Sequence, residues 1–235
     1  MKQKLHIGRG FTLVELLVVI VIIAALAGLT APMVIRQRKK ADQTEAVNNA
    51  KQIGLAMFEF ENAYGSFPDG NATISQITAG NFTISSPSTS NDYFRQLMAA
   101  EISQSEAMFY AKAGYSKKPD NVYLPSGTAL AAGEVGFGYI MNGTAAFSTA
   151  GNPSRPIVVA PLAFTTSVAT DGKFDVDMYD AKAVVLRIDN SVQSLNVTRS
   201  TQQASLGGNA TLLTTGDSTV WGTGVTPKII EPLKK

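Results

Sequence analysis

The sequence predicts an α+β fold, in which one long N-terminal helix packs on a C-terminal head made of an antiparallel β-sheet and extra short helices. Three observations predict it: an apolar run near the N-terminus, a helical apolar stripe that follows this run, and alternating β-rich runs after residue 119. The 235 residues then divide into a leader at 1–10, a transmembrane helix at 11–35, an amphipathic extension of the helix at 36–64 and a head at 65–235.

The composition excludes several classes of protein. The chain has no cysteine, so it has no disulfide, thiol nucleophile or thiolate metal ligand. Its one histidine, His6, lies in the basic leader, which excludes a histidine-based catalytic triad or a site with several histidine ligands. The net charge is only +2, and the head has no basic patch with interleaved aromatic residues. We therefore expect neither an enzyme nor a nucleic-acid-binding protein, and no cofactor apart from the metal ion considered below.

The apolar run is long enough to cross a bilayer. Leu16 to Ile35 contains no charged side chain, and 20 helical residues at about 1.5 Å each span about 30 Å, the thickness of the hydrocarbon layer. Pro32 interrupts the helical hydrogen bonding because it has no backbone N–H, which leaves the carbonyl of Gly28 without its partner. The turn between Gly28 and Pro32 is therefore the weakest part of the predicted transmembrane helix.

Glu15 lies at the beginning of this helix, one turn after the apolar run starts. An acidic residue in a membrane segment is costly and indicates a function, with a positive partner nearby. The alternative is a carboxylate that lies among the lipid headgroups without a partner. A second alternative concerns Ala25-Leu26-Ala27, which has the form of an ordinary signal-peptidase site; Glu15 and the length of the apolar run argue against it.

The helical pattern continues beyond the membrane segment. Apolar side chains recur every three or four residues at Val47, Ala50, Ile53, Met57, Phe60 and Tyr64. This spacing places them on one face of a helix, which needs a sheet or another element to cover it. Gly65 and the turn-rich residues after it predict that the helix ends at Tyr64. One helix from Phe11 to Tyr64 would be about 80 Å long.

The head shows shorter patterns. Ser90-Asn91-Asp92 is typical of the start of a helix, and Ser103 followed by Glu106 has the spacing of a capping box for a further helix at 107–110. The β-rich runs predict strands at Gly136–Met141 and Pro156–Ala160, followed by a hairpin at 182–197 that turns at 189–191. We expect these strands to form an antiparallel sheet on the second half of the long helix.

Four aspartates lie within ten residues of the head: Asp171, Asp175, Asp177 and Asp180. Carboxylate oxygens at close spacing suit Ca²⁺, and we name Asp171, Asp175 and Asp177 as candidate ligands. The spacing is not that of an EF-hand, and the alternative is a solvated turn before the hairpin.

The N-terminal residues resemble a known family. Gly10 followed by FTLVELLVVIVIIAALA, after a short basic leader, resembles the signal of type IV pilin and type II secretion pseudopilin precursors, and YGSFPD after the helix resembles the major pseudopilins. The resemblance covers roughly residues 8–65. It implies that a prepilin peptidase cuts between Gly10 and Phe11 and methylates Phe11. It also implies that Glu15 neutralises the N-terminal amine of a neighbouring subunit, and that Pro32 is the helix-breaking proline of the family.

The resemblance implies a structural subunit of a type IV pilus-like or type II secretion pseudopilus filament. Its partners would be the prepilin peptidase, the assembly platform, identical or related pilin subunits and the lipid bilayer. The chain would cross the inner membrane once, with its N-terminus in the cytoplasm and its head in the periplasm, before it enters the filament. The alternative function is that of a membrane-anchored extracytoplasmic protein that binds DNA or carbohydrate.

Overall fold

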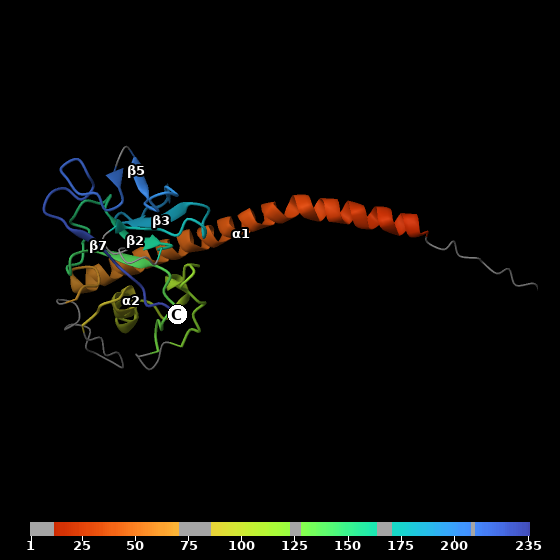
Figure 1. The fold of residues 1–235 in the computed structure, drawn as a ribbon. Helices are drawn as coiled ribbons and strands as arrows, with labels where there is room; N and C mark the ends of the chain where they lie inside the picture. Colours follow the sequence, from red (N-terminus) through yellow and green to blue (C-terminus); the bar gives the residue numbers. More distant parts are fainter. Residues whose placement is uncertain (1–11, 71–85, 123–127, 164–170, 208–209) are drawn as a thin grey trace, which may run out of the picture. The chain divides into compact units, whose positions relative to one another are not determined.

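The computed structural model describes residues 12–70, 86–122, 128–163, 171–207 and 210–235 (Figure 1). Gly10 and Phe11 lie outside the described residues. The chain divides into two compact units, residues 1–38 and residues 39–235. The predicted α+β architecture is confirmed: a long N-terminal helix precedes a head built on an antiparallel sheet.

The first unit contains the beginning of helix α1 (Leu13–Tyr64). Every side chain with a described burial from residue 12 to residue 38 is exposed. The most apolar window of the helix has a mean hydropathy of 2.8, and none of it is buried within the protein. By length and composition, α1 is therefore able to cross a membrane. The helix continues through Pro32. Two residues earlier, the Thr30 hydroxyl donates a hydrogen bond to the carbonyl of Leu26 at 3.0 Å, so this hydroxyl has its partner within the helix.

In the second unit α1 presents the predicted apolar stripe to the core. Ala50, Ile53, Met57 and Phe60 are buried, while the two ends of the stripe, Val47 and Tyr64, are partly buried. The helix ends where the sequence predicts, because Gly65 adopts a left-handed conformation with φ of 85° that terminates a helix without steric cost.

The main sheet has five antiparallel strands in the order β4-β3-β2-β1-β7. The strands are β1 (Gly138–Asn142), β2 (Pro156–Ala160), β3 (Lys182–Arg187), β4 (Val192–Asn196) and β7 (Pro227–Ile230). A smaller sheet pairs β5 (Ser205–Gly207) with β6 (Ala210–Thr211). The predicted strand Pro156–Ala160 and the hairpin are confirmed, and β1 begins two residues later than the predicted strand at Gly136.

The hairpin of β3 and β4 contacts the second half of α1. The Gln43 amide donates a hydrogen bond to the Ser194 hydroxyl at 2.7 Å. Further along the helix, a methyl group on Gly54 would lie 2.1 Å from the side-chain oxygen of Asn190 and 3.1 Å from Leu186. The helix backbone therefore approaches the hairpin closely, and the sheet covers the apolar stripe as the sequence predicts.

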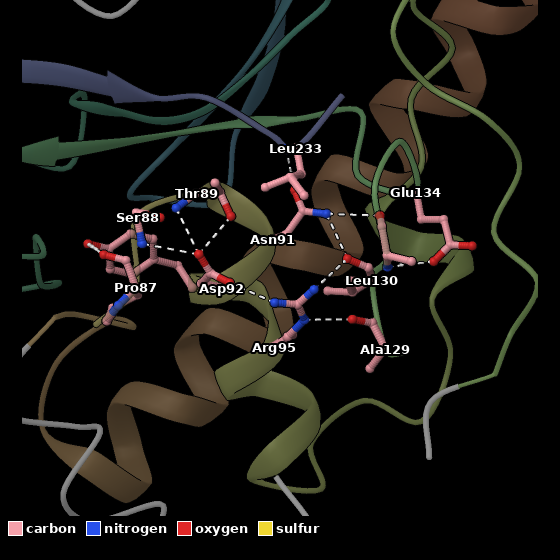
Figure 2. A network of polar contacts seen from close by, with 12 residues as sticks. Pro87, Ser88, Thr89, Asn91, Asp92, Arg95, Ala129, Leu130, Glu134 and Leu233 are labelled. Carbon is pink, nitrogen blue, oxygen red and sulfur yellow. Dashed lines mark hydrogen bonds and ion pairs between the residues drawn. The ribbon is translucent and has the colours of Figure 1, made fainter. Parts of the chain in front are cut away.

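Helix α2 (Ser90–Ala99) starts one residue later than its cap, which is Thr89 rather than the predicted Ser90. The Asp92 carboxylate accepts hydrogen bonds from the Thr89 N–H at 2.9 Å and from the Thr89 hydroxyl at 2.8 Å. Figure 2 shows Asp92 between Thr89 and Arg95. The Asp92 carboxylate also forms an ion pair with the Arg95 guanidinium at 2.6 Å. These contacts satisfy polar groups that the first turn of a helix leaves open.

The capping box predicted from Ser103 and Glu106 is wrong. The segment forms a single 3-10 turn, η1 (Ala107–Phe109), and the Glu106 side chain makes no capping hydrogen bond. The Glu106 carboxylate instead accepts a hydrogen bond from the Leu130 N–H at 2.7 Å. Leu130 is distant from Glu106 in the sequence, and its hydrogen bond holds the Glu106 side chain inside the head. The Glu106 carboxylate therefore does not cap the start of η1.

Candidate functional site

The beginning of α1 carries a compact polar arrangement around Glu15. One oxygen of its carboxylate, Oε2, accepts hydrogen bonds from both the N–H and the hydroxyl of Thr12, each at 2.8 Å. The Glu15 N–H in turn lies 3.3 Å from the Thr12 hydroxyl oxygen. Thr12 and Glu15 therefore form a capping box at the start of an apolar helix. The T-x-x-E spacing is visible in the sequence and is the local signal that predicts this capping box.

The arrangement can hold a negative charge where a helix favours one. The N-terminal end of a helix carries a partial positive charge, and unpaired N–H groups point towards it. Among the described residues, only Thr12 forms a hydrogen bond with the carboxylate, through one of its two oxygens. A carboxylate accepts about four hydrogen bonds, so Glu15 retains capacity for a further positive or donor group.

Of the other predicted processing and assembly residues, the structure describes only Pro32. Pro32 lies within α1, and 17 residues of helix place its backbone about 25 Å from that of Glu15. Phe11, next to Thr12 in the chain, and Gly10 lie outside the described residues. Among the described residues at the beginning of α1, the polar arrangement thus consists of Thr12 and Glu15.

The three aspartates predicted as calcium ligands make contacts of their own in the head. Asp171 pairs with Lys173 at 3.6 Å, and the Asp175 carboxylate accepts a hydrogen bond from the Asp177 N–H at 2.8 Å. Asp177 also pairs with Arg199 at 3.7 Å. Within the part of the chain that the structure describes, these three carboxylates do not form a group whose oxygens all lie within 4.8 Å of one another. Calcium binding by this group stays a prediction.

Comparison with known proteins supports an assignment for the N-terminal region. Residues 8–31 match the prokaryotic N-terminal methylation motif. The chain is 38% identical to type II secretion system core protein G of Escherichia coli over 71 residues, which are 29% of this chain and 48% of that protein. It is 44% identical over 55 residues to core protein G of Aeromonas hydrophila, covering 23% and 38% of the two chains.

The same protein of Vibrio cholerae is 36% identical over 63 residues, covering 26% of this chain and 43% of that one. The chain therefore spans less than half the length of these relatives. No solved structure matches it.

The methylation motif stands at the start of an exposed apolar helix, and this helix and the antiparallel head form a pilin-like α+β architecture. The N-terminal region is similar to that of type II secretion system core protein G.

Proposed function

We propose that this chain is a structural subunit of a type II secretion pseudopilus or a related type IV pilus-like filament. It is made as a prepilin that is cleaved after Gly10 and methylated at Phe11. The observation that carries the proposal is the part of α1 that lies in the first unit. This apolar stretch of helix exposes all its described side chains, and at its start the Glu15 carboxylate accepts a hydrogen bond from Thr12. Such a helix needs lipid around it before assembly and other apolar helices around it afterwards.

Glu15 would set the axial position of each subunit. A carboxylate that leaves water needs an opposite charge, because a buried charge without a partner costs several kcal/mol. Cleavage after Gly10 creates an amine at Phe11, four residues before Glu15. When helices pack side by side, the amine of one subunit can reach the Glu15 carboxylate of another. Thr12 orients that carboxylate through Oε2, so the other carboxylate oxygen, Oε1, is available to the amine.

Processing would also change the charge of the chain. The leader carries three positive side chains, Lys2, Lys4 and Arg9, and no acidic one. Its removal takes the side-chain balance of the chain from +2 to 2 − 3 = −1. In this proposal the leader lies in the cytoplasm and the head in the periplasm, and the partners are the prepilin peptidase, the assembly platform and related pilin subunits.

The test compares Glu15→Ala with Glu59→Ala, which removes an exposed carboxylate from the second half of the same helix. Both variants are expected to yield the mature chain, with residues 1–10 absent and one methyl group on Phe11, in intact-protein mass spectrometry. Glu15→Ala should reduce the amount of sheared filament at least tenfold, while Glu59→Ala should leave it unchanged.

Two outcomes contradict the proposal. If Glu15→Ala forms filaments at the normal level, the carboxylate does not pair with a neighbouring amine. If the native chain retains its leader, Phe11 never becomes a terminus and the chain is not processed as a prepilin.

A further inference from the structure

Two buried glutamates lie in the head, away from the helix that carries the proposed function. Glu106 precedes η1, and Glu134 lies in the loop before β1; the accessible fraction of each is 0%. Fully buried carboxylates are rare because an ionised carboxylate loses its hydration on burial. Such a group needs a compensating charge, and the surroundings of both glutamates show what that charge could be.

Each glutamate accepts a hydrogen bond from one backbone N–H of the same loop. The Leu130 N–H donates to Glu106 Oε1 at 2.7 Å, and the Ala131 N–H donates to Glu134 Oε2 at 2.7 Å. The remaining oxygens, Glu106 Oε2 and Glu134 Oε1, are buried and have no hydrogen-bond partner. The Lys117 ammonium lies 3.4 Å from Glu134 Oε1, whereas Glu106 Oε2 has neither a hydrogen bond nor an ion pair among the described residues. Native proteins rarely leave buried polar atoms unpaired, so Glu106 Oε2 indicates a missing ligand.

A third carboxylate completes the group. One oxygen from each of Glu106, Asp120 and Glu134 lies within 4.8 Å of the other two. Oxygens that bind one Ca²⁺ at about 2.3–2.6 Å lie up to about 5 Å apart across the ion, so this spacing fits a single coordination sphere. Asp120 is exposed, which leaves the group open to solvent on one side.

Charge at the group favours a divalent ion. The Lys117 ammonium lies 3.4 Å from Glu134 Oε1, and its side chain is 47% exposed. Three carboxylates and one ammonium leave two negative charges. Lys117 pairs with Glu134, and no ion pair compensates Glu106 among the described residues, so the group has more carboxylates than compensating charges.

The loop that supplies the backbone donors is itself anchored. The Asn91 amide and the Arg95 guanidinium of α2 both donate to the Leu130 carbonyl, at 2.7 Å and 3.0 Å. Figure 2 shows both side chains directed at Leu130, with Glu134 on the same loop. The N–H groups that orient the two glutamates are thus held in place by α2, so the geometry does not depend on a ligand to form it.

We propose that Glu106, Asp120 and Glu134 form a binding site for a hard divalent cation, with Ca²⁺ as the best fit. Oxygen ligands with charge suit such ions, and Lys117 can swing into solvent when the ion enters. The site is distinct from the Asp171, Asp175 and Asp177 group. A bound ion would join the residues before η1 to the loop before β1 and so stabilise the head.

The test measures thermal unfolding of the full chain in detergent micelles at neutral pH, followed by the fluorescence of Trp221. Metal is first removed with a chelator and the chelator is dialysed away. Addition of Ca²⁺ at about a hundred times its dissociation constant should raise the melting temperature by about 5–10 °C. Asp120→Asn, which changes an exposed side chain, should remove this rise. Asp177→Asn, the matched control in the other acidic group, should keep it.

Lys117→Met separates an ion site from a simple salt bridge. If the ion displaces the lysine, this variant should show a larger rise with Ca²⁺ than the wild-type chain. Titration calorimetry should give one ion per chain. The proposal is overturned if the wild-type chain shows no rise with about 10 mM Ca²⁺ or Mg²⁺. It is also overturned if Asp120→Asn keeps the whole rise, or if the rise disappears in Asp177→Asn and not in Asp120→Asn.

Discussion

Gly136 lies where two backbone segments meet, just before β1. Its N–H donates to the Phe109 carbonyl at 2.9 Å, and a methyl group on it would lie 2.1 Å from the carbonyl oxygen and 2.3 Å from the nitrogen of Ala111. Backbone atoms cannot turn away as a side chain can, so the segments would have to separate.

We therefore expect Gly136→Ala to destabilise the chain by about 3 kcal/mol, measured as a lower melting temperature in detergent. Gly114→Ala is the control, because its added methyl group meets no atom within 4 Å and its effect should be small. Equal melting temperatures of the two variants would contradict the close approach.

The sequence predicts the role of Glu15 but not that of Glu106. Glu15 is conspicuous because it is the acidic residue beside a charge-free run, and its partner Thr12 is three residues away. Glu106 was misinterpreted because its spacing from Ser103 fits a capping box, whereas its actual donor, Leu130, is 24 residues further on. A local pattern cannot reveal a partner that only the fold brings near. The group of Glu106, Asp120 and Glu134 was missed for the same reason.

Helix α1 provides a matched pair of side chains for testing how the head packs on the helix. Phe60 is fully buried in the core, whereas Leu55, about one turn earlier, is 60% exposed. Phe60→Ala should cost about 3–5 kcal/mol of the free energy of unfolding, because it removes a large buried ring and leaves a cavity.

Leu55→Ala should change the same quantity by less than about 0.5 kcal/mol, as is usual for exposed positions. Denaturant unfolding of both variants in the same detergent measures the difference. A similar loss in both would mean that this face of the helix is also covered in the isolated chain.

Elements with local signals were predicted well. The stripe on α1 follows from spacing along one helix, and the hairpin of β3 and β4 from two alternating runs around one turn. Strand β7 was not predicted, because it has only four residues and its pairing partner is β1, with Ile230 opposite Tyr139. A short strand at the edge of a sheet is defined by its neighbour, and that neighbour is far away in the sequence.

For the whole molecule, the charge pattern and the proposed function disagree about orientation. The leader carries three positive side chains, whereas Arg36, Arg38, Lys39 and Lys40 place four just after the apolar run. Positive residues near a membrane helix favour the cytoplasmic side, so the count alone slightly favours a cytoplasmic head. The proposed function places the head on the opposite side, in the periplasm. The family signal and the charge count therefore make opposite predictions.

Cysteine labelling decides between them, because the chain has no cysteine of its own. We expect a cysteine at Ser200, an exposed position of the head, to react with a membrane-impermeant maleimide in spheroplasts. A cysteine at Gln3, in a strain without the prepilin peptidase so that the leader is retained, should react only after the membrane is permeabilised. If Gln3→Cys is labelled first and Ser200→Cys only after permeabilisation, the positive residues after the helix govern the orientation, and the head lies on the wrong side of the membrane to enter a filament.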